Sequence, residues 1–414
     1  MRKRPVFIIN TRQLVNVALV AAFACAIVGA LLGACVEARA EENAKFAFTP
    51  YGFLRFDVMS SDSQMNNNLA PMWVLNEYAD GAIKDDATLA YHPRLTRLGV
   101  KFSGFALSDK WTLDGGVEID FQIFDAGTES RQVPRMRLGY MRLNYNDLHI
   151  MVGQHWDMIS TLYPNVNLNG VNWNIGNTGD RRPQIRVTYS PDLGNGKAYL
   201  TAGLSEASAV AGTDVDRNNI PDGIDSAMPL LQGWFGADQK FGDGGSIKAG
   251  VWGSYWDEKD AKVITDAEAP DDVIVTDISS WSVGLDLKVT ATSWLMFQGE
   301  VWTGSNLGDI RGGIGQTINP SAEEIAATGG WIEADFTLSK KVKLIGGYTM
   351  DDVKDEDIVD GMRAKNQAPY GALRWTPFKN FMLTGEYVRF ETTYLGFDKT
   401  SVNNHVVAHM MYFF

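Results

Sequence analysis

Hydrophobic and polar positions alternate along most of this chain, in segments of about ten residues that are rich in aromatic and β-branched side chains. Alternation with a period of two is typical of β-strands that present one apolar and one polar face. A strand tilted by about 45° crosses a bilayer with about 9–11 residues. The pattern predicts about sixteen such strands: 46–58, 94–105, 110–122, 135–145, 148–155, 183–190, 197–205, 229–241, 245–256, 278–290, 293–303, 328–340, 342–352, 368–378, 380–391 and 403–414.

The connections between these segments alternate strictly between long and short. Short periplasmic turns and long extracellular loops on an even number of antiparallel strands are typical of bacterial outer-membrane barrels. In lipid every backbone N–H and C=O must pair, and only a closed barrel achieves this with strands. The sequence therefore predicts an all-β fold, a transmembrane antiparallel β-barrel. The predicted long loops are 59–93, 123–134, 156–182, 206–228, 257–277, 304–327, 353–367 and 392–402.

The period of two also predicts which face each side chain takes. In the segment 110–122, Val117 and Ile119 fall on one side, whereas Glu118 and Asp120 fall on the other. A charge at mid-bilayer depth costs about 2–4 kcal/mol for Arg or Lys. We therefore expect the apolar set to face lipid and the polar set to face a wet lumen.

The N-terminus has the pattern of an export signal. Basic residues precede an apolar run from about Val15 to Leu32, and Ala38-Arg39-Ala40 forms a small-x-small cleavage site. This predicts a cleaved signal peptide over residues 1–40 and a barrel domain over 41–414. Two alternatives are an uncleaved membrane anchor and a lipoprotein box at Leu32-Gly33-Ala34-Cys35, with lipidation at Cys35.

The last segment, 403–414, alternates up to a C-terminal Phe414, with Tyr412 two residues before it. A final strand of this kind resembles the signal that the barrel assembly machinery reads. The sequence thus predicts the outer membrane of a Gram-negative bacterium as its location, with outer-membrane lipids and lipopolysaccharide as its surroundings.

The charge balance argues against nucleic acid as a partner. The formal net charge is −13, and removing the five basic residues and one acid of the predicted signal peptide takes it to −17. Phosphate binding requires a basic surface. Both cysteines, Cys25 and Cys35, also precede the predicted cleavage site.

Charged residues on the predicted inward faces are the candidates for pore chemistry. Because their strands are consecutive, Glu118 and Asp120 can lie opposite Arg135 or Arg137. One interpretation is a set of ion pairs that stiffen the wall; the other is a basic ladder that draws anionic solutes through the pore. The candidates are Arg55, Arg97, Lys101, Arg135, Arg137, Arg186 and Arg374, accompanied by Asp57, Glu118 and Asp120.

The long loop 156–182 is the best candidate for a constriction. It is the third long loop, it is rich in Asn, and it ends on Asp180-Arg181-Arg182. We expect it to fold into the barrel, where Arg181 and Arg182 would add positive potential to a narrow aqueous passage. The alternative is an ordinary polar surface loop.

A second long loop carries a pattern of oxygen ligands. Its residues Asp214, Asp216, Asn218, Asp222 and Asp225 resemble the acidic calcium loops of the D-x-D-x-N type, in which hard oxygens surround the cation. Gly and the terminal Glu are not where an EF-hand requires them. Calcium is thus the one candidate cofactor, and the alternative is a solvated acidic loop.

Enzymatic function is not expected. A hydrolase on a barrel needs a nucleophile beside a histidine. The five histidines, His92, His149, His155, His405 and His409, stand beside no recognisable nucleophile motif.

Four segments carry a family resemblance: Arg94-Leu-Thr-Arg97-Leu-Gly-Val-Lys101-Phe, Gly116-Val-Glu118-Ile-Asp120-Phe, Arg135-Met-Arg137-Leu-Gly-Tyr and Val152-Gly-Gln154. Together they resemble the DcaP-like family of trimeric outer-membrane porins, most clearly over residues 94–190. The resemblance implies a sixteen-stranded homotrimer that passes small anionic solutes such as dicarboxylates. It also implies that Arg97, Arg135 and Arg137 contact the solute.

The sequence as a whole predicts a porin that passively conducts ions and small hydrophilic, preferentially anionic solutes. Alternatives are a non-selective or cation-selective porin and, from a different class, a structural or adhesive surface barrel with a plugged lumen. Local lumen charge sets selectivity more than net charge does. The acidic residues concentrated in the long loops therefore do not argue against an anion preference.

Overall fold

The computed structural model describes residues 46–82, 86–123, 130–166, 170–242, 244–264 and 273–414. The predicted signal peptide lies outside the described residues, and so does Cys35. Within the described residues, no helix combines the length and the hydropathy that a membrane crossing requires.

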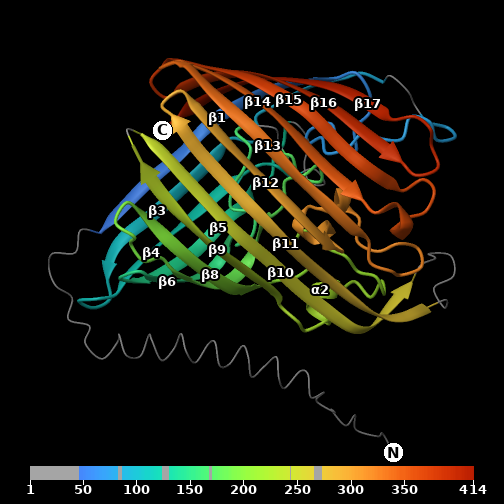
Figure 1. Cartoon of the computed structure of the whole chain (residues 1–414), viewed down its shortest axis with the longest axis horizontal. Coiled ribbons are helices and arrows are strands. Elements are labelled where there is room, and N and C mark those ends of the chain that lie inside the picture. Colours follow the sequence, from blue (N-terminus) through green and yellow to red (C-terminus); the bar gives the residue numbers. More distant parts are fainter. Residues whose placement is uncertain (1–45, 83–85, 124–129, 167–169, 243, 265–272) are drawn as a thin grey trace, which may run out of the picture.

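The described strands form one closed antiparallel barrel (Figure 1). Strand β1 (Ala47–Ser61) pairs with the last strand, β17 (Ser401–Phe413), on one side and with β3 (Arg97–Ala106) on the other, which closes the sheet. Each further strand pairs with its neighbours in the chain. These are β4 (Thr112–Asp120), β5 (Arg135–Tyr145), β6 (Leu148–Trp156), β7 (Arg181–Tyr189), β8 (Gly196–Ser205), β9 (Leu230–Phe241), β10 (Gly245–Ile264), β11 (Val273–Thr292), β12 (Leu295–Ser305), β13 (Ala326–Ser339), β14 (Val342–Val353), β15 (Arg363–Phe378) and β16 (Phe381–Tyr394).

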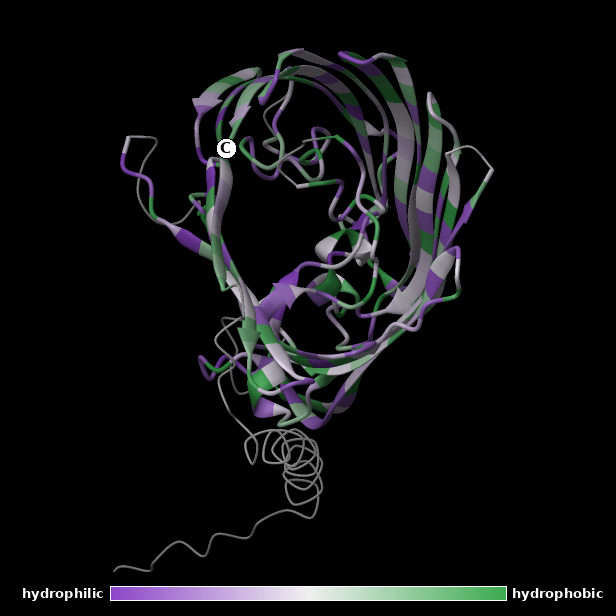
Figure 2. Ribbon diagram, turned by 90° about the vertical axis from the view of Figure 1, so that its left-hand side faces the viewer, coloured by the Kyte–Doolittle hydropathy of each residue, from purple (hydrophilic) through white to green (hydrophobic). Residues whose placement is uncertain are grey.

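Hydrophilic and hydrophobic residues alternate along the barrel strands (Figure 2). In β12 the outward side chains of Phe297 and Val301 are 42% and 58% exposed, whereas the inward side chains of Glu300 and Trp302 are each 3% exposed. An apolar exterior of this kind is stable only against lipid, because a soluble protein rarely exposes a large continuous apolar surface. The alternation read from the sequence therefore gives the correct facing.

One strand position of the barrel is occupied by two strands in succession, β2 (Thr88–His92) and β3. Strand β2 pairs with the end of β1, and β3 resumes the same pairing at Arg97. Pro93 lies in the interruption, and a proline cannot donate to the sheet ladder. The predicted strand 94–105 and the predicted loop 59–93 are thus corrected: β1 runs on to Ser61, and residues 88–92 are strand. With β2 and β3 counted as one strand, the described residues form a sixteen-stranded barrel, as predicted.

The hairpin of β10 and β11 extends beyond its predicted length. The sequence predicts a loop over 257–277, but β10 continues to Ile264 and β11 begins at Val273. A bulge between Glu258 and Ala261 interrupts the ladder without ending it. Most of that predicted loop is therefore strand.

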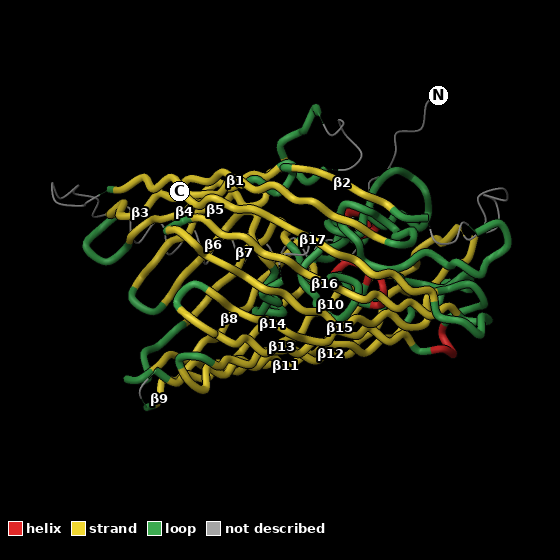
Figure 3. The backbone as a smooth tube through the Cα atoms, turned by 90° about the horizontal axis from the view of Figure 1, so that it is seen from above, coloured by secondary structure: helices red, strands yellow, loops and turns green. Residues whose placement is uncertain are grey.

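Long and short connections lie at opposite ends of the barrel. The turns 146–147, 340–341 and 379–380 lie at the end of the barrel that holds Phe414, where β1 begins. The short helical segments lie at the other end (Figure 3). They are α2 (Asp222–Asp225), η1 (Gly308–Ile310), η2 (Gly313–Gly315) and η3 (Asp355–Asp357).

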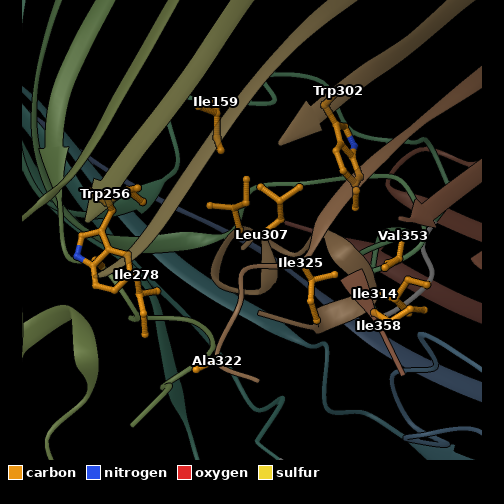
Figure 4. Packing of buried hydrophobic residues seen from close by; sticks show 14 of the residues in the cluster. Ile159, Trp256, Ile278, Trp302, Leu307, Ile314, Ala322, Ile325, Val353 and Ile358 are labelled. Carbon is orange, nitrogen blue, oxygen red and sulfur yellow. The ribbon is translucent and has the colours of Figure 1, made fainter. Parts of the chain in front are cut away.

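A hydrophobic core lies among the long loops, inside the barrel mouth (Figure 4). Leu307, Ile314 and Ile325 of the loop 306–325 are fully buried, and they pack with Trp256 and Trp302 of the barrel wall. The loop 306–325 is therefore a fixed part of the structure and closes one sector of the lumen.

Candidate functional site

The candidate site is a cavity of about 440 Å³ inside the barrel. Its wall consists of inward side chains from strands near the start and near the end of the sequence, and of three loops that fold into the lumen. Among the described residues, seven arginines and no carboxylate line it. These arginines are Arg55, Arg97, Arg135, Arg137, Arg181, Arg311 and Arg374.

Acidic residues stand behind the wall arginines. The register of β4 and β5 places Asp120 opposite Arg135, as the sequence predicts. Arg135 donates to Asp120 through Nε and Nη2, both at 2.9 Å. Arg137 bridges Glu118 at 2.7 Å and Asp120 at 2.8 Å, and Arg97 lies 3.5 Å from Glu118. Because the carboxylates are buried, the guanidiniums form the surface that a solute meets.

Two further predicted arginines reach the cavity from other strands. Arg55 of β1 lies 2.8 Å from the buried Asp57 and presents its side chain to the cavity. Arg374 of β15 donates to the backbone carbonyl of Asn165 in the loop 157–180. Besides the arginines of β3 and β5, the cavity thus has basic residues from β1 and β15.

The loop 157–180 folds into the barrel, as the sequence predicts for 156–182. Trp302 Nε1 donates to the carbonyl of Gly176 at 2.7 Å, and Asn366 donates to the carbonyl of Asn174 at 2.9 Å. The loop therefore crosses the lumen to β12 and β15.

Buried carboxylates of β11 and β13 accept hydrogen bonds from this loop and hold it in place. The backbone N–H of Asn165 donates to both oxygens of Glu333, at 3.0 and 2.9 Å. The hydroxyl of Thr161 donates to Asp286 at 2.8 Å. These bonds add loop donors to buried acids that also accept from Gln298, Tyr370 and Trp234 of the wall, so the loop and the wall stabilise each other.

The two arginines that end the loop have different surroundings. Arg181 lies over the rings of Trp156 and Trp173 and lines the cavity. Arg182 is fully buried between Asp157, at 2.7 Å, and Asp309, at 2.5 Å. Arg182 is therefore a structural crosslink away from the cavity.

Two other predicted lumen residues also lie outside the cavity wall. Lys101 lies over the ring of Tyr51, 4.8 Å from its centroid. Arg186 donates to the carbonyl of Trp156 and contacts Nδ1 of His155 at 3.2 Å. Both belong to the inner face of the barrel, but neither contributes to the seven-arginine surface.

Sequence reasoning missed the contribution of two other loops. Arg311 of the loop 306–325 lines the cavity, and so do Ala70 and Met72 of the loop 62–82. The loop 62–82 is held against the wall because Asn366 donates to the carbonyl of Met72. The one sequence signal near Arg311 is the run of glycines from Gly308 to Gly315, which indicates an irregular, tightly folded segment.

The acidic loop predicted to bind calcium folds as a set of side-chain-capped turns. The N–H of Asn218 donates to Asp214 at 3.0 Å, and that of Val215 donates to Asp222 at 2.8 Å. Throughout the described part of the chain, no group of three or more acidic, histidine or cysteine side chains is arranged to hold a metal. The geometry therefore does not support the predicted calcium site, because its carboxylates cap backbone amides.

Comparison with solved structures identifies the fold. The crystal structure of the outer membrane channel DcaP of Acinetobacter baumannii matches with a TM-score of 0.68 and 19% identity, over 90% of this chain and 99% of that one. An anion-selective porin from Comamonas acidovorans matches with a TM-score of 0.56 and 12% identity, over 89% and 100%. The trimer form of OmpT of Vibrio cholerae matches with a TM-score of 0.55 and 16% identity, over 89% and 99%.

No protein-family model and no curated protein matches the sequence. At these identities the likeness to the solved structures concerns the fold. The chain has the sixteen-stranded barrel fold of outer-membrane porins.

Proposed function

We propose that this chain is an outer-membrane porin that passively conducts ions and small hydrophilic solutes, with a preference for anions such as small dicarboxylates. The observation that carries the proposal is the cavity, whose wall has seven arginines and no carboxylate among the described residues. Guanidinium groups bind carboxylates well because they are always charged and present several donors. A charged passage with low-dielectric walls also raises the local concentration of counter-ions.

The assembly and location belong to the same proposal. We infer a homotrimer in the outer membrane, surrounded by lipid and lipopolysaccharide and inserted by the barrel assembly machinery. The apolar exterior supports this location. One solved structure of the same fold was obtained as a trimer. No enzymatic role is proposed.

The test is the reversal potential of the purified protein in a planar bilayer under a potassium chloride gradient. We expect stepwise openings that favour chloride. The double variant Arg97→Gln/Arg135→Gln should lower the chloride-to-potassium permeability ratio, because it removes two wall arginines whose side chains are accessible, 26% and 31% exposed. Arg389→Gln, on an exposed pair with Glu391 of β16, is the matched control and should leave the ratio unchanged.

Each other outcome of this experiment has a definite meaning. Cation selectivity of the wild-type channel would refute the anion preference and leave the porin. An absence of conductance would refute the porin and favour the plugged barrel, in which the hydrophobic loop core closes the lumen.

A further inference from the structure

Arg311 is fixed at the cavity by a loop that does not belong to the barrel wall. Its Nε and Nη2 donate to Asp180 Oδ2 at 2.9 and 2.7 Å. Its guanidinium lies 4.9 Å from the ring centroid of Trp173. About a quarter of the side chain remains exposed, so the charge is held in place and still accessible.

Arg311 is also the end of an alternating stack of cations and aromatic rings. Arg137 lies 5.8 Å from the ring centroid of Trp156, and Arg181 lies 4.8 Å from the same ring. Arg181 lies 5.6 Å from Trp173, which Arg311 contacts from the loop 306–325. The stack therefore links the barrel wall to two loops.

The acid that joins the two loops is fully ionised at neutral pH. Asp180 lies 3.0 Å from Arg181 and 2.7 Å from Arg311. Burial by itself raises the pKa of Asp180, but the guanidiniums of Arg181 and Arg311 outweigh it and hold this pKa at about 2. Asp180 therefore pairs with both arginines as a carboxylate.

The backbone of the loop 306–325 supports this position. The N–H of Asn174 donates to the carbonyl of Arg311 at 2.9 Å, and the N–H of Gly179 donates to that of Ile310 at 2.8 Å. Arg311 has a φ of 69°, a left-handed conformation that an arginine adopts only where its surroundings impose it. Ile310 and Ile314, on either side, are buried in the loop core.

The charges of this network do not balance. Within the described residues, five guanidiniums, those of Arg97, Arg135, Arg137, Arg181 and Arg311, are connected to three carboxylates, those of Glu118, Asp120 and Asp180. The carboxylates and two of the arginines are almost completely buried. The excess of two positive charges is therefore presented by Arg97, Arg135 and Arg311, whose side chains are 26%, 31% and 25% exposed.

We propose that Arg311 is a specificity-determining residue for anion passage, and that Asp180 is its positioning residue. The selective surface is then assembled from the barrel wall and from two loops, and the loop 306–325 supplies the charge that completes it. This inference rests on the proposed porin function and adds a residue to it.

The first test is the permeability ratio of the variant Arg311→Gln in a planar bilayer. The chloride-to-potassium ratio should fall by about fourfold or more, because one unit charge about 4 Å away changes the local concentration of each ion by about two- to fivefold, in opposite directions, in a water-like dielectric after screening. Arg311→Lys should keep most of the ratio. Wild-type anion selectivity that persists unchanged in Arg311→Gln would overturn this inference and leave the proposed function standing, whereas cation-selective wild-type protein would overturn the proposed function itself.

A second test restores the charge chemically. Both cysteines of the sequence precede the predicted cleavage site, so Arg311→Cys introduces a single thiol into the mature chain. A cationic methanethiosulfonate reagent should raise the lowered permeability ratio towards the wild-type value, and a neutral reagent of similar size should not. Arg389→Cys is the control at the rim. Equal effects of the two reagents on Arg311→Cys would contradict the inference, because the residue would then act through its size.

The role of Asp180 needs a readout beyond stability. Asp180→Asn should lower the permeability ratio in part, although it removes a negative charge, because Arg311 loses its anchor. A simple charge effect predicts the opposite sign, a higher ratio. Asp180→Glu should recover the wild-type ratio, and a rise in Asp180→Asn would refute the positioning role.

Discussion

Replacing Arg182 by methionine is expected to lower the free energy of unfolding by about 3–5 kcal/mol, the cost of breaking a buried charge network by removing one partner. Arg182 is fully buried, and it donates to Asp157 at 2.7 Å and to Asp309 at 2.5 Å. It also donates to the carbonyl of Glu206 at 3.1 Å. Without it, the carboxylates of Asp157 and Asp309, whose side chains are 0% and 17% exposed, lose their cationic partner.

The expected loss is large because Arg182 also connects three loops. Asp157 and Asp309 belong to the two inward loops, and Glu206 begins a third. Burial alone raises the pKa of Asp309, yet the guanidinium of Arg182 holds this pKa below its ordinary value. The arginine therefore stabilises the ionised acid directly, and its removal should loosen all three segments together.

Urea unfolding from lipid vesicles, followed by tryptophan fluorescence, measures this loss. The control Arg389→Met breaks an exposed pair and should cost at most about 1 kcal/mol. The triple variant Arg182→Met/Asp157→Asn/Asp309→Asn removes the unpaired charges and should recover part of the loss. A loss below about 1 kcal/mol in Arg182→Met would show that the site admits water and that the crosslink does not matter.

The substitution Val301→Arg is expected to cost about 2–4 kcal/mol, the penalty for a basic residue at the bilayer midplane on a lipid-facing barrel wall. Val301 points outward at mid-strand in β12, between Leu285 of β11 and Gly330 of β13. Among the described residues, the acids level with Val301 on these strands, Asp286, Glu300 and Glu333, are buried on the inner face and cannot pair with the new charge.

A matched variant tests the depth dependence. Leu338 is also exposed, but it lies at the end of β13, next to the turn 340–341. Leu338→Arg should cost only about 0–1 kcal/mol, because the side chain reaches the interface. The measurement is the same urea unfolding in vesicles, and equal costs for the two variants would mean that this wall does not face lipid.

The alternation of residue types was enough to predict the barrel because every strand in the bilayer meets the same requirement, an apolar face towards lipid and a polar face towards water. Alternation does not predict the parts of strands that extend beyond the bilayer. Residues 257–264 of β10 are strand because β11 continues to pair with them. Their charged stretch, Asp257 to Asp260, resembles a loop because a strand beyond the bilayer needs no apolar face.

The candidate site was predicted as far as it depends on strands. The facing of Arg97, Arg135 and Arg137 follows from strand periodicity, and their pairing with Glu118 and Asp120 follows from strand order. Loop residues do not follow the two-residue period of strands. The position of Arg311 therefore depends on tertiary packing that the sequence pattern does not encode. The inward loop 157–180 was predicted from its place in the chain order, whereas the packing of 62–82 against β15, β16 and β17 had no such signal.

The hydrophobic core of the loops implies that two parts of this protein are stabilised by different solvents, the barrel wall by lipid and the loop core by water. The barrel wall is stable because lipid offers its backbone no alternative partner. The loop core of Leu307, Ile314 and Ile325 is stable because water drives apolar side chains together, as in a globular protein. Urea weakens the second force more than the first. Moderate denaturant should therefore unfold the inward loops while the barrel stays intact, which leaves an open pore that no longer selects solutes.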